Sequence, residues 1–125
     1  MTGLGNILWF ILGGGVLISA IYLIGGLLLC CTIVGIPFGI QCIKLAALGV
    51  APFGAEIVSA ERGSGCLSVA MNLLWILVGG FWLTIVHLVF GLLCAITIIG
   101  IPFARQHVKL ASLALAPFGR KIQYL

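Results

Sequence analysis

The chain has 125 residues, of which 63% are hydrophobic and 6% are charged, with a formal net charge of +4. Soluble domains carry roughly 45–50% apolar and about 25% charged residues, and a core of this size cannot bury so much apolar surface. The composition therefore excludes a water-soluble globule. It predicts an integral membrane protein whose few basic residues contact lipid head groups and not nucleic acid.

Two stretches of the chain resemble each other. Residues 21–54 and 86–119 are identical at just over half of their positions, and Asn6-x-x-Trp9 returns as Asn72-x-x-Trp75. Duplicated membrane modules pair around an internal axis. We therefore predict an all-α fold of two tandem homologous repeats, residues 6–54 and 68–119, with a polar linker at 55–67 and a short basic tail at 120–125.

Each repeat begins with a long apolar segment, residues 7–31 and 73–96. About 20 residues cross a bilayer as a helix, so each segment is long enough to span. Glycines in such helices let another backbone approach closely. The predicted packing glycines are Gly13, Gly14, Gly26, Gly79, Gly80 and Gly91. The tryptophans near the segment ends are expected to be exposed interface anchors, namely Trp9, Trp75 and Trp82.

A Gly-Ile-Pro sequence follows each long segment. Proline lacks a backbone donor and disfavours helix in the preceding residue, so helix breaks are predicted at Pro37 and Pro102. A shorter helix then covers residues 38–50 and 103–115. Each ends at an Ala-Pro-Phe-Gly sequence, where Pro52 and Pro117 stop it.

The linker at residues 55–67 contains Glu56, Glu61, Arg62 and the glycine-rich stretch 63–65. It is the only stretch that is typical of a water-exposed loop.

Polar residues of the two short helices also repeat. Gln41 and Lys44 return as Gln106 and Lys109, and Arg105 joins the second pair. These side chains are candidate pore or head-group contacts. If the short helices lie flat in the interface, the chain spans twice and its repeats are inverted. If they cross, the chain spans four times, with the lysines and Arg105 at a costly depth.

Few residues here are suited to catalysis or metal binding. No Asp occurs, and the two carboxylates, Glu56 and Glu61, lie in the linker, so an enzyme is not expected. The five cysteines show no metal-ligand spacing, and each histidine, taken alone, is expected to be a packing residue. We predict neither a cofactor nor a metal.

The Asn-x-x-Trp start, the sequence Gly-Ile-Pro-Phe-x-x-Gln-x-x-Lys-Leu-Ala and the later Ala-Pro-Phe-Gly resemble the YccF family of small bacterial inner-membrane proteins. The resemblance covers residues 6–122, with Ala104-Arg105 where the first copy has Gly39-Ile40. It implies a bacterial cytoplasmic membrane and a domain with two to four membrane segments. It implies no activity, ligand or catalytic residue.

Two functions are compatible with these features. The first is a multi-pass membrane component that assembles with itself or with another membrane protein. The alternative is a small oligomeric ion channel or transporter that favours anions, with Gln41, Lys44, Gln106 and Lys109 near its path.

Overall fold

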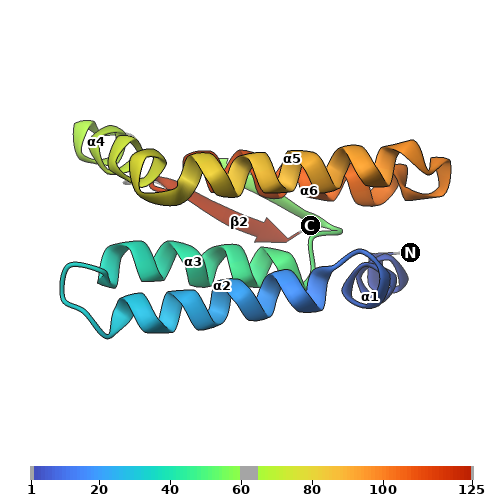
Figure 1. Ribbon diagram of the computed structural model, residues 1–125, viewed down its shortest axis with the longest axis horizontal. Coiled ribbons are helices and arrows are strands. Elements are labelled where there is room, and N and C mark those ends of the chain that lie inside the picture. Colours follow the sequence, from blue (N-terminus) through green and yellow to red (C-terminus); the bar gives the residue numbers. More distant parts are fainter. Residues whose placement is uncertain (1, 60–64, 125) are drawn as a thin grey trace. The chain divides into compact units, whose positions relative to one another are not determined.

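The computed structural model describes residues 2–59 and 65–124 (Figure 1). In chain order its elements are α1 (Thr2–Leu12), α2 (Gly15–Cys30), α3 (Ile36–Val50), β1 (Ala55–Ser59), α4 (Cys66–Trp75), a π-helical turn (Ile76–Gly80), α5 (Phe81–Ile96), a 3₁₀ turn (Ile98–Gly100), α6 (Ile101–Leu115) and β2 (Arg120–Tyr124). The predicted helical character is confirmed. The all-α prediction is wrong in one respect, because β1 and β2 pair in a two-stranded sheet.

Contacts divide the chain into two units. The first comprises the residues up to Glu56 together with Tyr124, and the second covers Ile57–Gln123. Each unit is built on one helical hairpin, in which α2 packs against α3 or α5 packs against α6.

The predicted linker and tail both contain regular structure. Residues 55–59 form β1 where a loop was expected, and residues 120–124 form β2 where a tail was expected. The linker residues Glu61, Arg62, Gly63 and Ser64 lie outside the described residues.

The first long segment is not the single helix that hydropathy predicted. It divides into α1 and α2, whose axes differ by 76° across Gly13 and Gly14. Gly14 adopts a left-handed conformation with φ of 90°, which side chains disfavour. The chain therefore turns sharply where an uninterrupted helix was expected.

The second long segment does form one helix, Cys66–Ile96, with the π-helical turn inside it. Within the described residues this helix is the one that is long and apolar enough to cross a membrane. If the bent pair α1–α2 forms one broken span, these residues contain two candidate spans. A larger number of crossings remains a prediction.

The turn that joins the two helices of each hairpin is stabilised by hydrogen bonds of a threonine hydroxyl within the turn. The hydroxyl of Thr32 donates to the Leu29 carbonyl at 2.9 Å and accepts from the Gly35 N–H at 3.0 Å. An added Cβ at Gly35 would collide with the Leu29 carbonyl, so the turn requires glycine. In the second hairpin, Thr97 donates to the Cys94 carbonyl at 2.8 Å.

The Gly-Ile-Pro sequence begins the next helix. α3 starts at Ile36 and α6 starts at Ile101, each with its proline in the first turn, where a missing N–H costs nothing. The helices therefore begin two residues earlier than predicted, because the isoleucine before each proline is already helical.

Each Ala-Pro-Phe-Gly sequence forms a tight turn after the helix. The Ala55 N–H donates to the Pro52 carbonyl at 3.2 Å, and the Arg120 N–H donates to the Pro117 carbonyl at 3.4 Å. Gly54 and Gly119 have φ of 80° and 83°, as the third position of such a turn requires.

An asparagine fixes each of these turns to the helix that precedes the hairpin. Asn6 Nδ2 donates to the Phe53 carbonyl at 3.1 Å, and the Phe53 N–H donates to Asn6 Oδ1 at 2.8 Å. Asn72 makes the same two bonds with Phe118, at 3.0 and 2.8 Å. The amide side chain donates to the carbonyl and accepts from the N–H of the same residue, as the backbone of a neighbouring β-strand does.

The first tryptophan of each unit is a core residue. Trp9 Nε1 donates to the Gly49 carbonyl at 2.6 Å, and Trp75 Nε1 donates to the Ala114 carbonyl at 2.5 Å. Trp9 and Trp75 are 0% and 3% exposed, so their predicted role as exposed anchors is wrong. Each ring needs one buried carbonyl as a partner, and the hairpin supplies it. Trp82 is 68% exposed and is compatible with an anchor.

Candidate functional site

The five polar side chains predicted for a pore or for head-group contact have different environments. Gln41 and Gln106 are buried, Lys44 and Lys109 are half-buried, and Arg105 is exposed. Neighbours on a helix point about 100° apart, so Arg105 and Gln106 face different surroundings. The polar residues of α6 therefore do not form one continuous exposed stripe.

Both glutamines keep an unpaired oxygen. The Oε1 atoms of Gln41 and Gln106 are buried and have no hydrogen-bond partner within residues 2–59 and 65–124. The Gln106 amide nitrogen donates to the Pro102 carbonyl at 3.4 Å. A buried carbonyl oxygen without a partner is unfavourable by about 1–3 kcal/mol. The two amides are therefore available to accept from water or from another donor.

Sequence reasoning missed a pair of histidines in the second hairpin. His87 of α5 and His107 of α6 are both buried, and their Nδ1 atoms lie 3.5 Å apart. Phe90 stacks on His107 with ring centroids 5.9 Å apart. The corresponding residues of the first hairpin, Tyr22 and Cys42, are also both buried, but this burial is a feature of the fold and the residue pattern gave no signal for the pair.

This arrangement limits what the two histidines can do. One Nδ1–H can donate only if the other Nδ1 is unprotonated, so the contact can hold one shared proton. Two nitrogens are a sparse ligand set for a metal. No group of three metal-ligating side chains occurs among the residues that the structure describes.

Arg120, which we had placed in a basic tail, covers the end of α6. Its Nη1 donates to the Ser112 carbonyl at 2.8 Å and to the Ala116 carbonyl at 3.3 Å, and its Nη2 donates to Ser112 Oγ at 2.9 Å. A cation is favoured at this negative end of the helix dipole. Partial burial lowers the pKa of the guanidinium from its ordinary value, but arginine stays protonated at neutral pH.

Three of the predicted packing glycines lie against the partner helix of their own hairpin. A Cβ at Gly26 would lie 2.8 Å from the Gly39 carbonyl oxygen, and one at Gly91 would lie 3.3 Å from His107 Cβ. A Cβ at Gly80 would lie 3.0 Å from the Ala114 carbonyl oxygen and would overlap the Trp75 ring. Enlarging Gly26 or Gly91 would therefore disturb the hairpin itself.

The other three have different surroundings. Gly13 lies against Trp9 of its own segment, Gly14 makes the left-handed bend, and Gly79 has open space where a Cβ would be.

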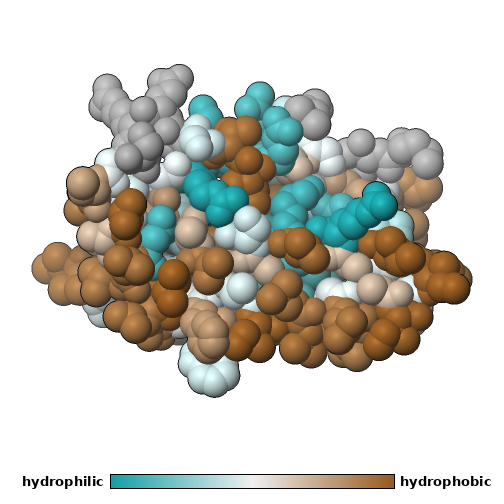
Figure 2. All heavy atoms as spheres, turned by 90° about the horizontal axis from the view of Figure 1, so that it is seen from above, coloured by the Kyte–Doolittle hydropathy of each residue, from teal (hydrophilic) through white to brown (hydrophobic). Residues whose placement is uncertain are grey.

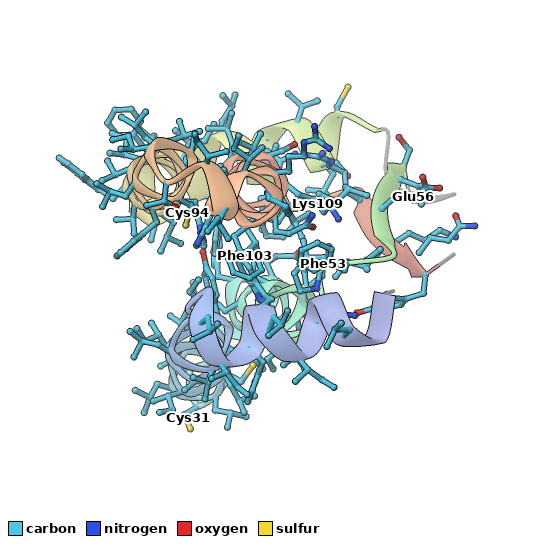
Figure 3. The ribbon with its side chains drawn as sticks, turned by 90° about the vertical axis from the view of Figure 1, so that its right-hand side faces the viewer. Cys31, Phe53, Glu56, Cys94, Phe103 and Lys109 are labelled. Carbon is cyan, nitrogen blue, oxygen red and sulfur yellow. The ribbon has the colours of Figure 1, made fainter. Side chains whose placement is uncertain are left out.

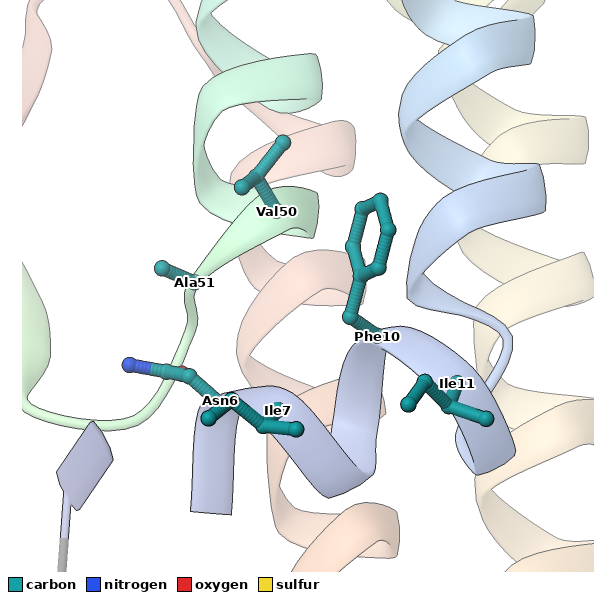
Figure 4. Close-up of a pocket in the computed structure, with 6 residues that line it drawn as sticks. All are labelled: Asn6, Ile7, Phe10, Ile11, Val50 and Ala51. Atoms are coloured by element: carbon teal, nitrogen blue, oxygen red, sulfur yellow. The ribbon is translucent and has the colours of Figure 1, made fainter. Parts of the chain in front are cut away.

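The surface of the first unit has two adjoining apolar grooves. One, of about 320 Å³, lies between α1 and the end of α3 and is lined by Asn6, Ile7, Phe10, Ile11, Val50 and Ala51 (Figure 4). The other, of about 420 Å³, lies between α2 and α3 and shares Phe10 and Val50 with the first. Small residues, Ser19, Ala20, Ala46 and Ala47, contribute to its lining.

Apolar side chains dominate the helix surfaces. Figure 2 shows hydrophobic residues along one long edge of the visible face, with hydrophilic residues gathered away from that edge. Water is a poor solvent for a surface of this kind, and lipid is a good one.

Comparison with known proteins agrees with these features. The family model described as the YccF inner membrane component domain matches residues 4–55 and 70–120. The chain is 30% identical to the inner membrane protein YccF of Escherichia coli (strain K12), with 94% of this chain and 84% of that protein covered. The YccF protein of Shigella flexneri matches to the same extent. No solved structure matches. The chain therefore belongs to the YccF family of bacterial inner-membrane proteins.

Proposed function

We propose that this inner-membrane protein is a structural component that assembles with further copies of itself. The larger groove of the first unit carries this proposal. Its small residues, among them Ala20 and Ala47, leave room for the backbone of an incoming helix. Helices associate in lipid mainly through such close packing, because lipid tails are as apolar as leucine side chains.

The same lining argues against a soluble ligand. The side chains of the groove are almost entirely apolar, and the one hydroxyl, from Ser19, is buried. We further propose that the two units are homologous repeats, since both contain the asparagine and tryptophan contacts at matching positions. We assign the protein no catalytic activity.

Filling the groove tests self-assembly. Ala47→Phe places a ring in the groove, whereas Ala70→Phe places one on an exposed position of α4. The oligomer distribution would be measured in lipid nanodiscs by native mass spectrometry. We expect the wild type and Ala70→Phe to form one defined oligomer, and Ala47→Phe to shift toward the monomer. A monomeric wild type, or an oligomer that Ala47→Phe leaves unchanged, would refute the proposal.

An ion path is the second candidate, favoured by the unpaired Gln41 and Gln106 oxygens and by the half-buried Lys44 and Lys109. Chloride flux into proteoliposomes would test it. If a path exists, the double variant Lys44→Gln/Lys109→Gln should lose its preference for anions, because basic rings select negative ions. Flux no greater than that of empty vesicles excludes this candidate.

A further inference from the structure

The tip of the α2–α3 hairpin is apolar and carries no charge. Ile33 and Val34 are 89% and 80% exposed, and Cys31 points outward from the hairpin (Figure 3). No charged residue occurs between Ile7 and Ile43. Contact with water costs such a tip about 25 cal/mol for each Å² of apolar surface, whereas contact with acyl chains costs it little.

The backbone of this tip forms bonds of its own. The Thr32 N–H donates to the Leu29 carbonyl at 3.0 Å, and the Ile36 N–H donates to the Ile33 carbonyl at 3.4 Å. The Thr32 hydroxyl accepts a hydrogen bond from the Gly35 N–H, and Pro37 has no N–H. Backbone groups in the hydrocarbon must find partners inside the protein, and this turn supplies several of them.

The hairpin is short for a bilayer. α2 has 16 residues and α3 has 15, which correspond to about 24 and 22 Å of helix. The hydrocarbon core is about 30 Å thick. A hairpin anchored at one head-group layer therefore ends inside the core.

Polar groups gather at the opposite end of the hairpin. Asn6 binds Phe53 there, and the exposed Glu56 follows two residues after the turn. α1 meets α2 at 76°, so α1 runs nearly parallel to the membrane surface when α2 is perpendicular to it. The bend is explained if α1 lies in the interface between head groups and acyl chains while the α2–α3 hairpin extends from it into the bilayer.

We propose that the α2–α3 hairpin is re-entrant. Residues 31–34 end among acyl chains in the bilayer interior, and α2 and α3 pass through the same head-group layer. The partner of the tip is therefore lipid. The proposal concerns the first hairpin alone, because Arg105 is exposed only four residues from the start of α6.

Cys31 is a natural reporter of the depth of the tip. A membrane-impermeant maleimide would be applied to right-side-out and to inverted membrane vesicles. Peptide mass spectrometry would then identify the cysteine that carries the label. Ser59→Cys, at an exposed position of β1, marks the polar end of the hairpin. We expect the thiol introduced by Ser59→Cys to react from one side, and Cys31 to react only after the membrane is dissolved.

A nitroxide on Cys31, with the other cysteines replaced by alanine, distinguishes lipid from protein around the tip. We expect frequent collisions with oxygen and rare collisions with a water-soluble nickel chelate. Few collisions with either would mean that protein covers the tip. Maleimide labelling of Cys31 from the opposite face would mean that the hairpin spans. Labelling from the same face as position 59 would mean that it lies on the surface. Each of these three results overturns the proposal.

A charge at the tip gives an independent test. We expect Ile33→Lys to lower the yield of folded, membrane-extracted protein several-fold, because a lysine is costly in the hydrocarbon. Ser59→Lys should have little effect. Equal yields of the two variants would contradict a tip in lipid.

Discussion

The two units differ most where the chain enters its hairpin. Gly15 follows Trp9 by six residues, whereas Gly80 follows Trp75 by five. In both units the glycine leaves room for the indole ring, and the indole N–H binds a carbonyl near the end of the second hairpin helix. The contact is therefore the same although the chain length between its partners differs.

The two junctions differ in length by one residue, and the path of the backbone differs with it. In the first unit, Gly14 turns left-handed and α1 bends away from α2 by 76°. In the second, the shorter connection stays helical through the π-helical turn Ile76–Gly80. A π-helical turn is a single turn with i→i+5 hydrogen bonds inside an α-helix, so the helix continues through it. Both junctions therefore bury their tryptophan, the first with a sharp bend between two helices and the second within one continuous helix.

Removing the tryptophans should have the largest effect. Trp9→Ala and Trp75→Ala each leave a large cavity and are expected to lower the free energy of unfolding by about 3–5 kcal/mol. Trp82→Ala, at an exposed position, is the control. Denaturant unfolding in detergent micelles would measure all three. Similar losses in the two units would show that both junctions depend on the same contact, and a loss confined to one would contradict this.

The histidine pair should give a smaller effect, confined to the second unit. His87→Phe, His107→Phe and the double variant form a cycle whose coupling energy is expected to be about 1 kcal/mol, because the two rings are in contact. His87→Phe combined with Trp82→Ala provides a reference cycle. Additive losses for the two histidines would show that their Nδ1 contact contributes nothing.

Alanine in place of the junction glycines should have small effects that are opposite in sign. Gly14→Ala forces a side chain into a left-handed conformation and should cost about 1–2 kcal/mol. Gly79→Ala enters open space in a helix and should stabilise the fold by about 0.5–1 kcal/mol. Thermal unfolding in one detergent would compare them. Equal signs would mean that the bend at Gly14 is not required by the fold.

Local sequence signals located the hairpins closely. Pro37 lies in the first turn of α3 and Pro52 follows its last residue by two, because proline acts on the backbone of its immediate neighbours, whatever the tertiary fold. The ends of α6 follow from Pro102 and Pro117 in the same way.

Features that depend on distant contacts were missed. The residue pattern places Trp9 near the start of an apolar segment but cannot show that the Gly49 carbonyl accepts from its N–H. The left-handed conformation of Gly14 is likewise not visible in hydropathy, and His87 meets His107 only once the hairpin closes. The strands β1 and β2 are short and carry charged residues, so their pairing left little trace in the residue pattern.

The turn at Thr32 has a consequence for the order of events during synthesis. Its hydroxyl bonds only to residues three positions away, so the loop can close as soon as Gly35 is made. The Asn6 contacts must wait for Phe53, 47 residues later in translation. Both partners of that contact precede the second unit, which begins at Ile57. The helices and the Pro52 turn of the first unit can thus form while the ribosome is still elongating the second unit, and only the pairing of β1 must wait for β2.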